Sequence, residues 1–267
     1  MYFIDFHTHV YPDNIAYKAA QSVRDFYSGG NAQMDGKVGT LLDLGRQAGV
    51  DKFVILPVAM KPERTRSINN FILEQLTLHP EFYGFGTVHA GMSHLEDEIS
   101  YILDNGLKGI KLHPDSQVFP IDDPRLFPMY DAIRGRCPVL LHMGDTRFNY
   151  SHPIRLRKVL DLFPGLQVIA AHFGGYGMYD TAYELLKDTD CYFDVSSSLM
   201  FLKEGQPERF INLYGAERFV YGSDFPMWNP VEEMGRFLKL KLTPEQFEQI
   251  AHKTAEHLLQ LKKGTPR

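Results

Sequence analysis

The chain has 267 residues, of which 44% are apolar, and a formal net charge of −5 with both signs mixed along the sequence. This length suits one large domain or two small ones, and a single α/β barrel takes about 250 residues. The charge balance and the lack of a long basic run argue against nucleic acid as a partner. No apolar run is long enough to span a bilayer, so we expect no membrane partner.

The location of the protein is suggested by its amino terminus and its cysteines. No basic segment precedes an apolar run at the amino terminus, so we expect no signal peptide. Two cysteines, Cys137 and Cys191, do not imply a disulfide framework, which favours a reducing cytoplasm. Both begin predicted strands, and we expect them to be small buried hydrophobic residues.

The first ten residues predict a strand, because they are rich in aromatic and β-branched residues and contain no glycine or proline. Side chains alternate across a strand, so Asp5, His7 and His9 share one face. Two imidazoles in this arrangement can reach one divalent cation. The alternative, two polar residues on a solvated face, is excluded only if later strands bring more ligands to the same place.

Seven further apolar runs follow, and each ends in a polar or small residue. The eight predicted strands are residues 3–9, 52–58, 83–89, 109–113, 139–142, 168–172, 191–196 and 219–224. From residue 58 onward, successive strand ends are 24 to 31 residues apart. A strand, a helix and two loops need about that much chain, so each interval has room for a crossover helix.

The segments between these runs predict helices. The predicted helices are residues 38–48, 93–105, 122–134, 152–163, 176–187 and 206–214. Ser93 with Glu96 predicts a capping box at the start of the second of them. A tail helix over residues 243–262 is predicted to begin at a Thr-Pro-Glu cap.

Strands that alternate with helices favour parallel pairing, because parallel neighbours need crossover connections. The sequence therefore predicts an α/β fold, a single-domain (β/α)8 TIM barrel over residues 1–267. A doubly wound open sheet is the alternative, but no G-x-G-x-x-G motif follows the first strand. Residues 11–36 lengthen the first crossover and predict either a lid at the barrel rim or a plain surface excursion.

Chemistry collects at the carboxyl ends of the predicted strands. His7 and His9 end the first strand, His142 the fifth, His172 the sixth and Asp224 the eighth. In a parallel barrel these ends face one mouth, so the five side chains can converge. Imidazoles with a carboxylate suit one divalent metal ion, with Zn²⁺ as the first choice and Mn²⁺ or Fe²⁺ as alternatives.

The chain resembles the amidohydrolase superfamily, in the branch that includes aminocarboxymuconate-semialdehyde decarboxylase and related metal-dependent hydrolases. The resemblance runs from end to end and rests on five motifs in the family's order. They are Asp5-Phe-His-Thr-His9, Gly109-Ile-Lys-Leu-His-Pro114, Leu140-Leu-His-Met-Gly144, Ala170-Ala-His-Phe-Gly-Gly175 and Tyr221-Gly-Ser-Asp-Phe-Pro226.

The resemblance implies roles for the residues at the strand ends. His7, His9 and His142 would be metal ligands, and Asp224 would be a ligand or a close neighbour that moves the proton. His172 would orient or stabilise the metal-activated water. The metal would lower the pKa of that water to about 7 and polarise the substrate's carbonyl oxygen.

The sequence indicates the substrate-binding residues less specifically than the metal ligands. In two-metal relatives a lysine on the strand of Lys111 is carbamylated and bridges the metals. The resemblance to the one-metal branch favours one metal here, with Lys111 or His113 contacting an acidic substrate. A structural Lys111 paired with a carboxylate is the alternative. Arg147 is a further candidate for a substrate carboxylate, although most loop arginines are simply solvated. Trp228 predicts either an aromatic wall or loop packing.

Three functions are consistent with this pattern. The first is hydrolysis of a small amide, lactone or related carbonyl compound. The second is non-oxidative decarboxylation of an aromatic or unsaturated acid, and the third is a non-catalytic metal-binding barrel. Hydrolysis is placed first because His7 stands where some decarboxylase relatives carry Glu. A small, carboxylated substrate is expected, and family habit suggests a homodimer.

Overall fold

The computed structural model describes residues 2–27, 29 and 34–261. By its internal contacts the chain divides into two compact units. The first unit comprises Met1–Leu56 and Val195–Arg267, and the second comprises Pro57–Asp194. That the two form one domain stays a prediction. Each unit is described by itself below.

The second unit is built on five parallel strands that are neighbours in chain order. The strands are β4 (Gly86–Thr87), β5 (Ile110–Leu112), β6 (Val139–Leu141), β7 (Val168–Ala170) and β8 (Tyr192–Asp194). Each pairs in parallel with the next, in an order without reversal. A doubly wound sheet reverses its strand order at a switch point, so this order favours the barrel.

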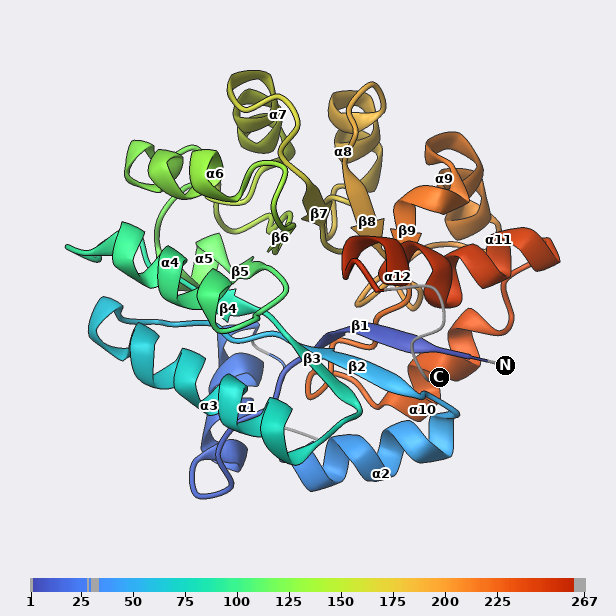
Figure 1. Cartoon of the computed structure of the whole chain (residues 1–267). Coiled ribbons are helices and arrows are strands. Elements are labelled where there is room, and N and C mark those ends of the chain that lie inside the picture. Colours follow the sequence, from blue (N-terminus) through green and yellow to red (C-terminus); the bar gives the residue numbers. More distant parts are fainter. Residues whose placement is uncertain (1, 28, 30–33, 262–267) are drawn as a thin grey trace. The chain divides into compact units, whose positions relative to one another are not determined.

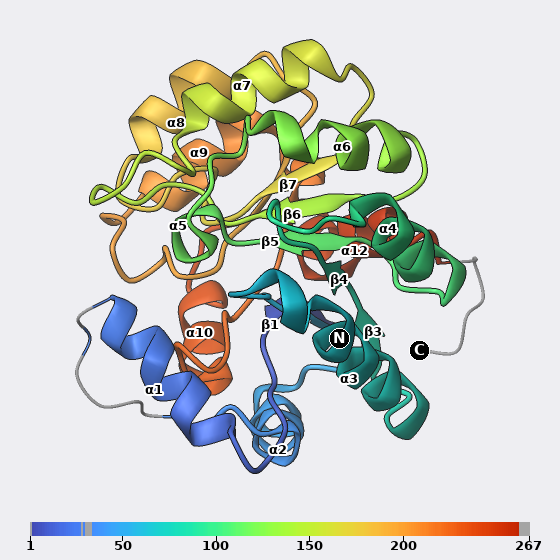
Figure 2. The same cartoon turned by 90° about the vertical axis from the view of Figure 1, so that its left-hand side faces the viewer.

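Helices on one side of these strands supply the crossovers (Figures 1 and 2). They are α3 (Thr65–Leu78), α4 (Leu95–Asp104), α6 (Phe127–Ile133), α7 (Pro153–Leu162) and α8 (Tyr179–Leu186), with short turns at Pro62–Arg64, Pro114–Gln117 (α5) and Pro124–Leu126. All the strand residues of β5, β6 and β7 are buried. β6 and β7 are continuous apolar runs, as expected of strands buried on both faces, which is why they were visible in the sequence, whereas β5 contains Lys111.

Two predictions in the second unit need correction. The predicted strand 83–89 is two short strands, β3 (Phe82–Gly84) and β4. The predicted capping box at Ser93 is wrong, because α4 begins at Leu95 after His94 and no side chain caps it. The three acidic residues of its first turn favour the start of the helix through their interaction with the helix dipole instead.

The first unit carries the amino-terminal strand. β1 (Ile4–Thr8) pairs in parallel with β2 (Lys52–Ile55). On its other side, the Phe6 N–H donates to the Tyr221 carbonyl at 2.8 Å, just after β9 (Phe219–Val220). All five residues of β1 are buried. The sequence segments before residue 57 and after residue 194 therefore meet along β1.

Helices α1 (Ala16–Phe26), α2 (Val38–Ala48), α9 (Gln206–Tyr214) and α10 (Pro230–Phe237) belong to the first unit. The predicted ranges of α2 and α9 match the observed ones. The helix α10, which the sequence analysis missed, starts at an Asn229 cap followed by proline and packs against α2. Of the predicted lid, residues 28 and 30–33 lie outside the described residues, and α1 is its helical part.

The predicted tail helix is interrupted. It consists of α11 (Pro244–Glu248), a π-helical turn (Gln249–Lys253) and α12 (Thr254–Leu258). A separate 3₁₀ turn lies earlier in the chain, at Ala216–Arg218. The Thr243 capping box is present, with Gln246 as its second member. Residue 262, the end of the predicted helix, lies outside the described residues.

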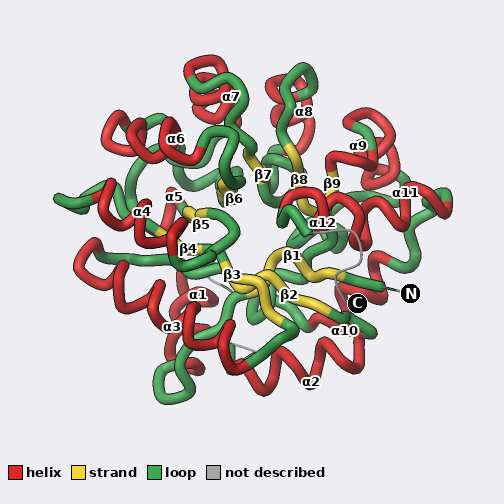
Figure 3. The backbone as a smooth tube through the Cα atoms, in the orientation of Figure 1, coloured by secondary structure: helices red, strands yellow, loops and turns green. Residues whose placement is uncertain are grey.

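The strands are short, and long loops leave them (Figure 3). Cys137 and Cys191 are buried, as predicted. Among the helices of the described residues, none has the length and apolar character needed to cross a bilayer.

Candidate metal centre

The first unit gathers three of the predicted metal ligands. The Nε2 atom of His7 lies 3.5 Å from Asp224 Oδ1, and that of His9 lies 3.4 Å from the same oxygen. These separations exceed good hydrogen-bond lengths but let all three atoms reach one ion. Asp224 adopts φ +59°, and its N–H donates to the His7 carbonyl at 2.7 Å. The loop after β9 is therefore fixed against β1 by the backbone of Asp224, the residue that carries the carboxylate.

Neighbouring groups set which nitrogen of each imidazole faces Asp224. The Nδ1 atom of His9 lies 2.6 Å from the Leu56 carbonyl, which can only accept, so this nitrogen carries the hydrogen. Nδ1 of His7 lies 3.1 Å from Ser196 Oγ. Metal-binding histidines are oriented by such bonds at their other nitrogen. The donor set of two Nε2 atoms and one carboxylate oxygen therefore fits a divalent ion.

A chain of two hydrogen bonds holds the second oxygen of Asp224. The indole N–H of Trp228 can only donate, and it donates to Ser197 Oγ at 2.8 Å. Ser197 in turn donates its hydroxyl hydrogen to Asp224 Oδ2. Because Trp228 fixes the direction of that hydroxyl, Asp224 keeps Oδ1 turned toward the two imidazoles.

Asp5 supports this arrangement from within the core. Its Oδ1 accepts the N–H of His7 at 3.2 Å and that of Ser223 at 2.9 Å. Burial raises the pKa of Asp5 to about 7, opposed by the bonds from Ser223 and His7, and the charge of Asp224 raises it further. Asp5 thus links β1 to the chain just before Asp224.

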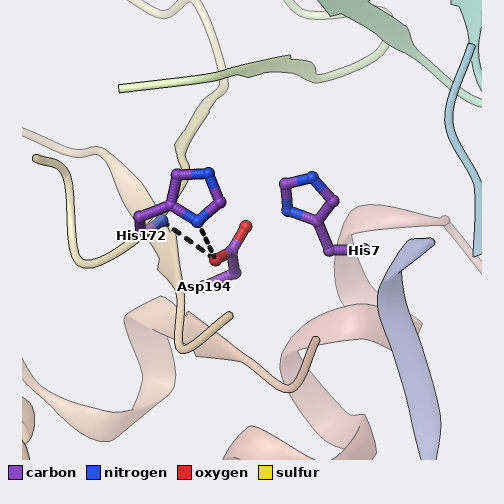
Figure 4. A group of neighbouring side chains, drawn as sticks. All are labelled: His7, His172 and Asp194. Carbon is purple, nitrogen blue, oxygen red and sulfur yellow. Dashed lines mark hydrogen bonds and ion pairs between the residues drawn. The ribbon is translucent and has the colours of Figure 1, made fainter. Parts of the chain in front are cut away.

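The second unit brings His142 and His172 together at the ends of β6 and β7. His172 Nε2 lies 3.0 Å from His142 Nδ1. The His172 N–H donates to Asp194 Oδ1 at 3.0 Å, and its Nδ1 lies 3.9 Å from the same oxygen (Figure 4). The sequence analysis missed Asp194. The sequence does contain a signal for it: an acidic residue lies near the end of the predicted strand 191–196, just as histidines lie at the ends of the two preceding predicted strands.

His113 lies against His142 in the same unit. The two rings stack with their centroids 3.9 Å apart, and Asp115 Oδ2 lies 3.9 Å from His142 Nε2. Burial raises the pKa of Asp115 to about 6, which the bond from Ser151 opposes and the charge of Asp145 reinforces. Asp115 also escaped the sequence analysis, because it follows a proline outside any predicted strand.

The other predicted substrate contacts are engaged within the second unit. Arg147 forms a bidentate pair with Asp145, with Nε at 2.9 Å from Oδ1 and Nη2 at 2.6 Å from Oδ2. Lys111 is buried in β5, and the Thr87 hydroxyl donates to its carbonyl. For Arg147 to bind a substrate carboxylate, it would have to leave Asp145. The roles of Lys111, His113 and Arg147 stay predictions.

The predicted ligand set is thus divided between the units. His7, His9 and Asp224 converge in the first unit, whereas His142 lies with His172 and His113 in the second. The full set of four ligands stays a prediction.

Residues 4–261 match the family described as Amidohydrolase. The chain belongs to the amidohydrolase family. No curated protein sequence matches this chain.

Solved structures similar to this chain include an uncharacterized TIM-barrel protein from Bordetella bronchiseptica, at 21% identity and a TM-score of 0.81 over 97% of this chain and 99% of that one. Another is 5-carboxyvanillate decarboxylase from Sphingomonas paucimobilis, at 15% identity and 0.77 over 97% and 99%. A third is a dihydroxybenzoic acid decarboxylase from a Polaromonas species, with bound manganese and the inhibitor 2-nitroresorcinol, at 16% identity and 0.74 over 97% of both chains.

These similarities confirm the predicted fold class. Near-complete coverage of a TIM-barrel protein at a TM-score of 0.81 shows that the chain has the α/β TIM-barrel fold. The parallel strands of each unit, which neighbour one another in chain order, agree with it.

Proposed function

We propose that this protein is a metal-dependent carboxy-lyase that releases CO₂ from a small aromatic or unsaturated carboxylic acid. The observation that carries the proposal is the Asp224 carboxylate, shared by two imidazole nitrogens and held by Ser197. The proposal is supported by the similar structures that are decarboxylases, one of them with manganese. It takes the place of hydrolysis, which the sequence analysis placed first.

Three residues of the first unit would hold the metal: His7, His9 and Asp224, with His142 proposed as the fourth ligand. A bound divalent ion would neutralise substrate oxygens and stabilise the negative charge that develops next to the reacting carbon. We propose Mn²⁺ first, because a similar structure binds it, with Zn²⁺ as the alternative. Elemental analysis of the purified protein tests this choice directly.

Asp224 is proposed to carry the proton. Decarboxylation forms a C–H bond at the carbon that bears the carboxylate, and the C–C bond then breaks. Its electron pair returns to the ring or double bond as CO₂ leaves, so one proton is consumed for each CO₂. Oδ1 of Asp224 would face the metal together with the two imidazoles, so Oδ2 is the oxygen proposed to exchange the proton. Ser197 donates to Oδ2 and accepts the N–H of Trp228, which orients Oδ2 for that exchange.

His172 is proposed as a positioning residue for that step. Its ring lies between His142 and Asp194, and its backbone at φ +60° is bonded to Asp194. Such support from several directions limits the rotation of the imidazole.

Hydrolysis of an amide or lactone is the second candidate. The observation that favours it is His7, which supplies a second imidazole where some decarboxylase relatives carry Glu. Both candidates use the same metal centre, so they differ in the substrate that is consumed and in the product.

The test uses the Mn²⁺-loaded protein and two panels, one of hydroxylated aromatic and unsaturated acids and one of lactones and amides. We expect CO₂ release from the first panel. In D₂O, one deuterium should appear at the carbon that lost CO₂, and Asp224→Asn should remove this activity while the fold is retained. Hydrolysis of the second panel without any CO₂ release would show that the chain is a hydrolase.

A further inference from the structure

One buried glutamine joins three segments of the chain within the second unit. Gln117, the last residue of α5, is 3% exposed. Its side-chain Nε2 donates to the carbonyls of Ala59 and Val88, each at 2.9 Å, and its Oε1 accepts the N–H of His113 at 2.9 Å. Along the chain, these three residues follow β2, β4 and β5. Both donors and the oxygen of one amide are therefore used to fix segments that come after strands.

The turn that carries Gln117 is strained. Val118 adopts φ +61°, a conformation that β-branched residues rarely take, and its side chain is 67% exposed. Burial of this side chain therefore does not compensate for the strain. The turn brings the Phe119 N–H to the Pro114 carbonyl at 3.2 Å. Strained residues persist where surrounding contacts fix them, and Gln117 supplies three such contacts here.

The histidine that Gln117 holds has a defined tautomer. His113 is the N-cap residue of α5, and its Nδ1 accepts the Ser116 N–H at 3.3 Å. A nitrogen that accepts a hydrogen bond carries no hydrogen, so the neutral imidazole has its hydrogen on Nε2. The backbone N–H of the same residue is the one that Gln117 accepts. The ring and the backbone of His113 are thus fixed by adjacent residues of one short turn.

The stack of His113 on His142 indicates a hydrogen-bond donor and not a second metal ligand. The two rings are 7° from parallel, and their centroids are 3.9 Å apart. The lone pair of an imidazole nitrogen lies in the plane of its ring, so two parallel rings do not direct their lone pairs at one ion. The group through which His113 would contact a substrate is therefore the N–H of Nε2.

We propose that Gln117 is a positioning residue, which fixes His113 as a donor from Nε2–H to an oxygen atom of the substrate. The inference rests on the proposed function, in which negative charge develops on the substrate. A donor that is held in place before the reaction stabilises such charge without reorganisation. The sequence analysis gave His113 only as an alternative to Lys111 for contact with an acidic substrate, and it did not name Gln117.

Nuclear magnetic resonance of histidine side chains tests the positioning without turnover. The protein is labelled with ¹⁵N-histidine and loaded with Zn²⁺, because Mn²⁺ is paramagnetic and broadens nearby signals. The signals of His113 are those that disappear in His113→Asn. Circular dichroism establishes which variants are folded.

Two variants of Gln117 separate its roles. Gln117→Met removes all three hydrogen bonds, whereas Gln117→Glu keeps an oxygen that can accept the His113 N–H. Gln75→Met is the matched control, because it makes the same replacement at another buried glutamine of the second unit, in α3. His152 is the internal control, since it caps α7 through Nδ1, which accepts the Ile154 N–H at 3.1 Å.

We expect Nδ1 of His113 to lack a hydrogen in wild type, in Gln117→Glu and in Gln75→Met. In Gln117→Met both tautomers should be populated, because the backbone that carries the ring is no longer held. Gln117→Asn, whose side chain is too short to reach all three partners, replaces Gln117→Met if the latter does not fold. His152 should keep its tautomer in every variant.

A hydrogen on Nδ1 of His113 in wild type would overturn the inference. An unchanged His113 tautomer in the folded Gln117→Met or Gln117→Asn variant would also overturn it, because Gln117 would then only support the loops.

Kinetics on an acid that releases CO₂ test the donor itself. His113→Asn keeps an acceptor for the Ser116 N–H, since asparagine is a good N-cap residue, but it lacks Nε2–H. We expect kcat/KM to fall about 10–100-fold, as for the loss of a hydrogen bond to a charged group. Gln117→Met should lower kcat/KM about 10-fold in wild type and less than about twofold in His113→Asn, because Gln117 acts through His113.

Equal losses from Gln117→Met in the two backgrounds would contradict the proposed route through His113. The tautomer measurement separates the inference from the proposed function. If the tautomer depends on Gln117 but no acid releases CO₂, the proposed function fails while the positioning of His113 by Gln117 stands.

Discussion

Replacing Glu233 by glutamine should change how stability depends on pH. Glu233, in α10, is 1% exposed, and one of its oxygens pairs with Arg236 while the other has no partner. Burial raises its pKa from 4.5 to about 7, which the charge and hydrogen bond of Arg236 oppose and the charges of Asp224 and Glu232 reinforce. Between these pH values the folded state retains a proton that the unfolded state releases.

The direction and the size of the change in stability follow from this difference between the folded and unfolded pKa of Glu233. The stability linked to this proton is present below about pH 4.5 and is lost as pH rises through about 7. At about 1.4 kcal/mol for each pH unit, the loss between pH 5 and pH 8 is about 2–3 kcal/mol. Glutamine cannot titrate, so the variant does not lose this stability. Between pH 5 and pH 8, the free energy of unfolding of Glu233→Gln minus that of wild type should therefore rise by about 2–3 kcal/mol.

Urea denaturation of both proteins at pH 5 and pH 8, at one fixed metal concentration, measures this change. The variant-minus-wild-type difference cancels the titration of the other groups and any constant cost of the amide. Parallel pH profiles, with a difference below about 0.5 kcal/mol, would show that Glu233 is ionised in the folded protein at neutral pH, and the reasoning from burial would fail.

Three further substitutions have expected outcomes. Ser197→Ala removes the donor that holds Asp224, and isothermal titration should show Mn²⁺ affinity lowered about 10–100-fold. His142→Ala should lower metal content, measured by elemental analysis, and abolish activity; full metal and full rate would remove His142 from the ligand set. Gly109→Ala should lower the free energy of unfolding by about 1–3 kcal/mol, because the added Cβ would lie 2.6 Å from the Pro138 carbonyl.

Matched controls separate these effects from general ones. Ser67→Ala removes an exposed hydroxyl that bonds only to a backbone carbonyl of the preceding turn, and it should leave metal affinity unchanged. Gly39→Ala adds a Cβ with nothing within 4 Å in α2 and should stabilise that helix slightly.

The sequence by itself determined the alternation of strands and helices and the polar residues at the strand ends. Both are local patterns, because burial of a strand or one face of a helix fixes the spacing of apolar residues over a few positions. His7 and His9 could be assigned to one strand face in this way. The extra helices α3 and α10 escaped notice because the analysis followed the strand ends.

The tertiary structure decided which groups support the site. Ser197 bonds to both Asp224 and Trp228, and Asp194 bonds to His172, across 22 to 31 residues of chain. Arg147, predicted either to bind a substrate carboxylate or to be solvated, pairs with Asp145, and the buried Nε of Arg24, which no motif indicated, has no hydrogen-bond partner. Such partners depend on the path of loops and the rotamers at their ends, which no short-range periodicity encodes.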